Sequence, residues 1–149
     1  TEALLAHTPQ EVIERWRDVS VTYRIRQVVH YGGQVCSSLL VEHPRTGKPV
    51  LRYNEPAQED ERFLNRHALQ YHGIEPDQVR AFEEDLQARL HDPRFYYGHA
   101  WQQNDVVIAD NFSLLHGREA FTARSARHLQ RVHIHADPLC HNTALQPGA

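Results

Sequence analysis

A two-residue alternation of apolar and polar side chains constrains the fold of this chain more than any other feature. Val21, Tyr23 and Ile25 alternate with polar residues, which is the pattern of a half-buried β-strand. The Gly-Gly pair at 32–33 predicts a turn, and residues 35–41 are a second strand candidate. A parallel α/β sheet needs strands and helices to alternate along the chain. They do not alternate here, so the sequence argues against that class.

Two helices are expected beside these strands. Thr8 as N-cap, with Pro9 at the first helical position and Glu11 two residues later, predicts a helix over about 9–18. Apolar side chains at three- and four-residue spacing predict an amphipathic helix over roughly 76–90. Polar and acidic residues over 56–72 predict a surface excursion. Further short strands are expected at 50–53, 105–109, 114–117 and 131–135.

The composition argues against several classes of protein. The chain has 149 residues with 16 Lys+Arg against 19 Asp+Glu, a net charge of −3, so we expect no nucleic-acid partner. Its longest apolar run, residues 106–109, is too short to cross a bilayer. Two cysteines and no recognisable signal peptide favour a reduced, cytoplasmic, single-domain protein. The absence of methionine favours a piece of a longer polypeptide.

The residues with the clearest chemistry lie in the last third of the chain. His116 follows an apolar segment, and Arg127 and Arg131 follow it at a four-residue spacing. A neutral imidazole can bind Fe, Zn or Cu, and a guanidinium can pair with a carboxylate through two hydrogen bonds. The residues alone leave two interpretations open: a carboxylate ligand held at a metal, or an ordinary histidine with solvated arginines. A structural zinc site around His128, His133 and His135 is a weaker alternative, because further ligands are missing.

The segment from Trp101 to Arg118, with the Arg-x-x-x-Arg pair after it, resembles the C-terminal signature of the TauD/TfdA family of Fe(II)- and 2-oxoglutarate-dependent dioxygenases. Asn104 stands where that family usually has glycine, in a turn position that asparagine tolerates. The stretch 43–47, His-Pro-Arg-Thr-Gly, and Tyr53-Asn54 resemble the family's central segment. The resemblance runs from about residue 40 to 137. It implies a β-dominated α+β fold with a double-stranded β-helix (jelly-roll, cupin-like) core and flanking helices.

The resemblance also implies roles for individual residues. His116 would be the distal histidine of a 2-His-1-carboxylate iron site. Arg127 would pair with the distal carboxylate of 2-oxoglutarate, and Arg131 would bind the cosubstrate or an anionic group of the substrate. Asp110 and Asn111 would hold the ligand-bearing turn together. Trp101 would lie in the core.

The family's other two iron ligands, a His-x-Asp or His-x-Glu pair, are missing upstream of His116. The pair at 135–137, His-Ala-Asp, follows the distal histidine and is rejected as their equivalent. Residues 1–149 therefore resemble the C-terminal portion of one dioxygenase domain. Residues 50–100 would form a lid or insertion with a helix, and 101–137 the terminal core strands. We expect the missing N-terminal segment of the same polypeptide as a partner, with a homo-oligomer left open.

The function implied by the resemblance is an oxygenase that uses Fe(II), 2-oxoglutarate and O2. It would couple decarboxylation of 2-oxoglutarate to succinate with hydroxylation, desaturation or oxidative decarboxylation of a small acid or amino-acid-derived metabolite. The amino-acid sequence around His116 and Arg131 resembles that of family members from bacterial secondary metabolism, including isonitrile pathways. The alternative is an iron-free, cupin-like binding or structural module. A chain without the His-x-Asp pair is what that alternative predicts if nothing precedes it.

Overall fold

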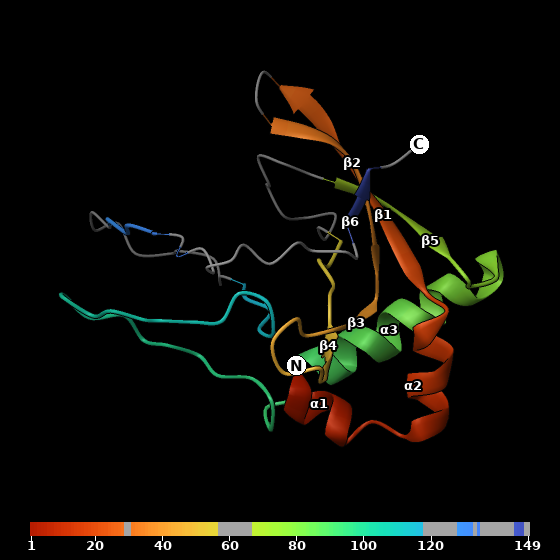
Figure 1. Ribbon diagram of the computed structural model, residues 1–149, viewed down its shortest axis with the longest axis horizontal. Helices are drawn as coiled ribbons and strands as arrows, with labels where there is room; N and C mark the ends of the chain where they lie inside the picture. The colour runs from red at the N-terminus through yellow and green to blue at the C-terminus, as the bar shows by residue number, and fades with distance from the viewer. Residues whose placement is uncertain (29–30, 57–66, 118–127, 133, 135–144, 148–149) are drawn as a thin grey trace.

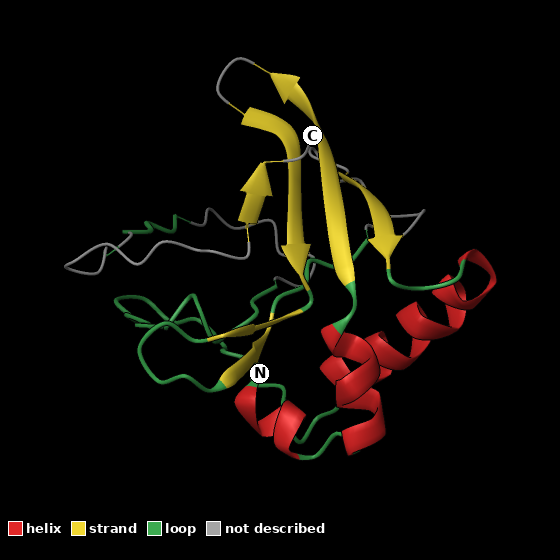
Figure 2. Ribbon diagram, turned by 45° about the vertical axis from the view of Figure 1, so that its right-hand side comes forward, coloured by secondary structure: helices red, strands yellow, loops and turns green. Residues whose placement is uncertain are grey.

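The computed structural model describes residues 1–28, 31–56, 67–117, 128–132, 134 and 145–147. A four-stranded sheet and a separate two-stranded sheet rise from a group of three helices at one end of the molecule (Figure 1). The second view shows the same layout, with the long strands extending away from the helices (Figure 2). The predicted mixture of strands with flanking helices is therefore confirmed. No helix in the described part of the chain is long and apolar enough to span a membrane.

Strand β1 (Ser20–Val28) forms where the alternating pattern predicts a strand, and it is a central strand of the larger sheet. It pairs antiparallel with β2 (Tyr31–Ser38) on one side and with β5 (His67–His72) on the other. A register shift interrupts the β1–β2 ladder between Ile25 and Val28. The turn predicted at residues 32–33 is wrong, because both glycines lie within β2. The short strand β6 (Leu145–Pro147) adds to the free edge of β2, giving the order β5-β1-β2-β6.

Strand β5 corrects the expectation that residues 56–72 form only a surface excursion. Its residues alternate between half-buried and exposed side chains, as in a sheet with one face covered. Leu69 pairs with Tyr23 and Tyr71 pairs with Val21, so both lie on the covered face. Residues 57–66 lie outside the described part of the chain.

The second sheet is a hairpin of β3 (Leu40–Glu42) and β4 (Pro49–Leu51). The connection at 43–48 closes through two backbone hydrogen bonds, Gly47 N to His43 O at 2.9 Å and His43 N to Lys48 O at 2.8 Å. Gly47 takes a φ of 67°, which glycine adopts without the penalty that a Cβ brings. The tight connection predicted at this motif is confirmed.

Three α-helices cover one end of the sheets. Helices α2 (Gln10–Arg17) and α3 (Val79–Leu90, preceded by the 3-10 turn η1, Pro76–Gln78) lie where the periodicity predicts them. Helix α1 (Glu2–Ala6) is an addition that the sequence pattern did not reveal. It also corrects the predicted cap of α2, because the Thr8 hydroxyl donates to the carbonyl oxygen of Leu4 in α1 at 2.9 Å, and Pro9 stands at the N-cap.

The core lies where the helices meet the start of the strands. Trp16 of α2 and Leu86 of α3 are buried together with Leu39 and Leu51. Burying one large apolar side chain stabilises a fold by roughly 1.5–3 kcal/mol, so this cluster fixes the helices against the hairpin. The guanidinium of Arg89 lies 5.9 Å from the Trp16 ring centroid and covers its outer side.

Gly73 allows the chain to pass from β5 to η1 close against the end of α2. Its φ is 79°, and an added Cβ would collide with the backbone carbonyl of Asp18. Two separate constraints, a left-handed backbone and a close backbone approach, therefore require glycine here. This contact fixes α3 relative to β1.

The strands expected at 105–109, 114–117 and 131–135 are not observed in the described residues of those segments. Val106 and Ile108 are 83% and 86% exposed, and Trp101 is 44% exposed and so is not a core residue. An isolated apolar run cannot become a strand without a neighbouring strand to accept its backbone hydrogen bonds. Asn104 has a φ of 71°, as expected for the turn position where glycine is usual.

Candidate functional site

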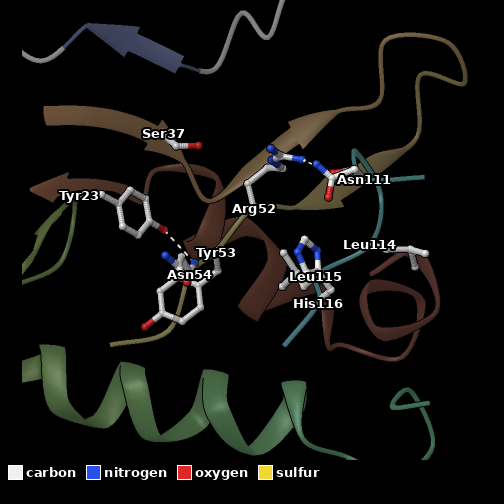
Figure 3. A pocket seen from close by; sticks show the side chains of 9 residues that line it. All are labelled: Tyr23, Ser37, Arg52, Tyr53, Asn54, Asn111, Leu114, Leu115 and His116. Carbon is white, nitrogen blue, oxygen red and sulfur yellow. Dashed lines mark hydrogen bonds between the residues drawn. The ribbon is translucent and has the colours of Figure 1, made fainter. Parts of the chain in front are cut away.

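The predicted ligand His116 lines a cavity of about 360 Å³ at the junction of the two sheets. Figure 3 shows nine side chains around it, which come from β1, β2, residues 52–54 directly after β4, and the segment 111–116. Two aromatic rings and two leucines form apolar parts of the wall, and one guanidinium and the imidazole are the basic groups. The lining residues are Tyr23, Ser37, Arg52, Tyr53, Asn54, Asn111, Leu114, Leu115 and His116.

Asp110 organises the turn that leads to His116. One carboxylate oxygen accepts from the backbone N–H of Phe112 at 2.9 Å, and the other accepts from the Ser113 hydroxyl at 2.7 Å. A third hydrogen bond, from His43 Nε2 at 3.0 Å, ties the turn to the β3–β4 hairpin. The hydrogen bonds from Ser113 and Phe112, reinforced by His43, lower the pKa of Asp110 to about 2. The expectation that Asp110 holds this turn together agrees with these contacts.

His43 is the buried anchor of that network, with 8% of its surface exposed. Its Nδ1 accepts from the backbone N–H groups of Arg45 and Thr46, at 3.2 and 3.3 Å. Nδ1 is therefore the acceptor nitrogen, and Nε2 carries the hydrogen that Asp110 accepts. The ring also packs edge-on against Phe112, with centroids 5.2 Å apart. The His-Pro-Arg-Thr-Gly motif at 43–47 thus supports the turn at 110–113, which is far from it in sequence.

Arg52 is a site residue that the sequence analysis missed. Its Nη1 donates to the carbonyl oxygens of Asn111 at 3.2 Å and Phe112 at 2.9 Å, and the guanidinium lies 4.9 Å from the Phe112 ring centroid. Burial lowers the pKa of Arg52, against the opposing influence of Tyr23 and Asp110. The signal available in the sequence was an arginine directly after the apolar pair Val50-Leu51 and directly before the Tyr-Asn pair.

Two tyrosines give the cavity rigid aromatic walls. The Tyr23 hydroxyl accepts from the backbone N–H of Asn54 at 3.2 Å, and burial raises its pKa to about 12. The Tyr71 hydroxyl donates to Glu83 of α3 at 2.6 Å, so its oxygen accepts from the Tyr53 hydroxyl at 2.8 Å. Burial raises the pKa of Tyr53 and of Tyr71. All three phenols therefore stay protonated near neutral pH.

The other predicted site residues are not brought to this cavity in the described structure. Arg131 is exposed and is not among the residues that line it, and His128 is exposed as well. Arg127, His133 and the segment 135–137 lie outside the described residues. Their predicted roles therefore stay predictions.

The described residues do not make a complete metal site. They contain no group of three or more His, Cys, Asp or Glu side chains that could hold a metal ion. His116 supplies one imidazole at a cavity, which is one of the three protein ligands that a 2-His-1-carboxylate iron site requires. The described part of the chain fits part of such a site and does not by itself fit the whole.

The class of protein follows from the arrangement of these elements. Two solved structures share this arrangement. PvcB from Pseudomonas aeruginosa has a TM-score of 0.79 and is 38% identical, over 99% of this chain and 48% of that one. A structure described as PvcB, an Fe, alpha-ketoglutarate dependent oxygenase from an isonitrile synthetic pathway, has a TM-score of 0.76 and is 38% identical, over 98% of this chain and 47% of that one. The chain thus shares the fold of about half of the PvcB structures.

The family follows from the sequence. The sequence model of the family described as "Taurine catabolism dioxygenase TauD, TfdA family" matches residues 1–133, and the chain belongs to this family. The resemblance seen in the motifs around His116 is thereby confirmed.

Three curated relatives have names from isonitrile chemistry. A tyrosine isonitrile desaturase of Pseudomonas aeruginosa is 42% identical over 147 residues, 98% of this chain and 50% of that protein. One from Erwinia amylovora is 42% identical over 139 residues, 93% and 47%. The 3-((Z)-2-isocyanoethenyl)-1H-indole synthase of Fischerella ambigua is 37% identical over 134 residues, 90% and 49%. The chain therefore spans about half the length of these relatives.

Proposed function

We propose that the protein to which this chain belongs is a non-haem Fe(II)- and 2-oxoglutarate-dependent oxygenase that oxidises an isonitrile derived from an amino acid. The observation that carries the proposal is His116, which lines a cavity just after the turn that His43, Asp110 and Arg52 hold together. The names of the relatives favour a tyrosine-derived isonitrile as substrate and desaturation as the outcome. When bound, iron with 2-oxoglutarate would supply the activation of O2.

The chain's own residues have distinct parts in this proposal. His116 would donate one imidazole to the iron, and the turn at 110–113 would fix the direction of that imidazole. Arg127 would pair with the distal carboxylate of 2-oxoglutarate, and Arg131 would bind the cosubstrate or an anionic group of the substrate. Tyr23 and Tyr53 would flank the substrate with their rings.

The remaining iron ligands would come from polypeptide outside this chain, as a His-x-Asp or His-x-Glu pair. Exposed apolar side chains support this view, because they need further strands to cover them: Val106, Val107, Ile108, Val132 and Ile134. Paired in this way, the sheets described above would close into a double-stranded β-helix. The chain would then be the C-terminal portion of one catalytic domain.

The test is turnover by the full-length protein. Purified protein with Fe(II), 2-oxoglutarate, O2 and tyrosine isonitrile should form succinate and consume the isonitrile in equal amounts, and H116A should form neither. Folding of H116A is checked by its thermal unfolding. A wild-type protein that folds but forms no succinate under these conditions would refute the proposal and favour the iron-free cupin-like module.

A further inference from the structure

Two hydrogen-bond donors of the cavity wall have no acceptor among the described residues. Arg52 uses Nη1 for the carbonyl oxygens of Asn111 and Phe112, while Nε and Nη2 donate to none of the described groups. Tyr23 accepts from the Asn54 N–H, and its own hydroxyl hydrogen has no described acceptor. A half-buried guanidinium and a phenol with unused donors are costly unless a ligand or water accepts from them.

The charge around these donors favours an anion. Among the described residues that line the cavity there is no Asp or Glu, and Arg52 is the one with a permanent charge. Tyr23 and Arg52 line the same cavity (Figure 3). Because the Tyr23 phenol stays protonated, its hydroxyl can donate to the same anion that the guanidinium binds.

We propose that Arg52 and Tyr23 form a binding subsite for the carboxylate of the oxidised substrate, on the cavity wall that His116 also lines. This inference rests on the proposed function and adds to it the group that orients the substrate. Arg52 has two roles in this account. Its Nη1 holds the turn that precedes His116, and its remaining N–H groups bind the carboxylate. The same side chain therefore holds the substrate and positions the turn.

The cavity also suits the rest of such a substrate. The rings of Tyr23 and Tyr53 and the side chains of Leu114 and Leu115 provide an apolar wall beside the basic group. Tyr53 is kept in place by the hydroxyl chain through Tyr71 to Glu83, so its ring is a fixed surface. A small carboxylate with an aromatic or aliphatic body matches this combination.

The experiment compares a carboxylate with its uncharged amide in the full-length protein. Tyrosine isonitrile and its primary carboxamide are titrated into anaerobic protein loaded with Fe(II) and 2-oxoglutarate, and dissociation constants are measured by calorimetry. R52Q should weaken binding of the carboxylate by roughly 10- to 100-fold and Y23F by roughly three- to tenfold, with little change for the amide. R80Q, which removes an exposed arginine of α3, is the matched control and should change neither constant.

Three outcomes would overturn the subsite. Equal weakening of carboxylate and amide by R52Q would mean that Arg52 only supports the turn. Weakened 2-oxoglutarate binding with unchanged substrate binding would assign the guanidinium to the cosubstrate. No change in either R52Q or Y23F would mean that the donors bind water only.

A failure of the proposed substrate is distinguishable from a failure of the subsite. If tyrosine isonitrile does not bind to the wild-type protein, 3-(4-hydroxyphenyl)propanoate and its amide are used as the probe pair. Preference for this carboxylate that is lost in R52Q would support the subsite without the isonitrile, and absence of any preference would refute it. If R52Q does not fold, Y23F and R52K are compared in its place. The dissociation constant of the carboxylate in R52K should then lie between those of wild type and of the double variant Y23F/R52K.

Discussion

Replacing Asp110 with alanine should loosen the turn that precedes His116 and destabilise the fold by about 2–6 kcal/mol. Two of the three hydrogen bonds lost are to Phe112 and Ser113 at the surface, where water can replace the carboxylate, so each contributes about 0.5–1.5 kcal/mol. The third is from the buried His43, and leaving its Nε2–H without an acceptor costs about 1–3 kcal/mol.

The assay is a double-mutant cycle on the full-length protein, with the free energy of unfolding measured in urea. S113A removes one exposed hydrogen bond and should cost about 1 kcal/mol. In an H43F background, D110A should cost about 1–3 kcal/mol less than in wild type, because the buried donor is gone. Strictly additive effects of D110A and H43F would refute the view that this pair anchors the turn. The metal affinity of D110A should also fall, because the turn that precedes His116 is loosened.

Three further predictions test the fold and its electrostatics. G73A should destabilise the full-length protein more than G47A in urea unfolding. Both positions have a positive φ, but only at Gly73 would an added Cβ collide with the backbone. Equal losses of unfolding free energy in the two variants would contradict this. The pKa of Asp110 is about 2 in the folded state, below its ordinary value of 3.8, so the stability it contributes is present above about pH 4 and is lost as the pH falls toward 2. The difference in unfolding free energy between wild type and D110N should shrink over that range, and a difference independent of pH would count against the network. Y71F leaves Glu83 and Tyr53 without their shared partner and should cost about 1–3 kcal/mol, measured by urea unfolding with Y97F, an exposed tyrosine, as the control that should change little.

The parts of the fold with a strong local pattern were predictable from the sequence. Helix α3 and strand β1 carry clear periodicities, and the structure confirms both. Strand β5 was missed because histidines stand at both of its ends, and only Leu69 and Tyr71 give an apolar signal. Helix α1 was missed because it has five residues and no side-chain cap.

The segment 105–109 shows the limit of local pattern in the other direction. Its apolar run predicts a strand, yet Val106 and Ile108 are exposed and unpaired in the described structure. Whether such a run becomes a strand depends on a neighbour that local sequence does not specify. The pattern identified the tendency correctly but could not identify the partner.

The candidate site was predictable only as far as its motif extended. His116 and Asp110 lie in one contiguous signature, so both were found from sequence. Arg52 escaped notice because its role depends on contact with Asn111 and Phe112, 59 and 60 residues further along the chain. Tertiary proximity of this kind leaves no spacing rule in a single sequence.

The most direct test of the central claim is whether His116 binds iron. Full-length protein is titrated anaerobically with Fe(II) in the presence of 2-oxoglutarate, and the visible metal-to-ligand charge-transfer band is recorded for wild type, H116A and the exposed-site control H128A. We predict the band in wild type and in H128A, and its loss in a folded H116A. A band of wild-type intensity and affinity in H116A, or no band in the wild-type protein, would contradict the account.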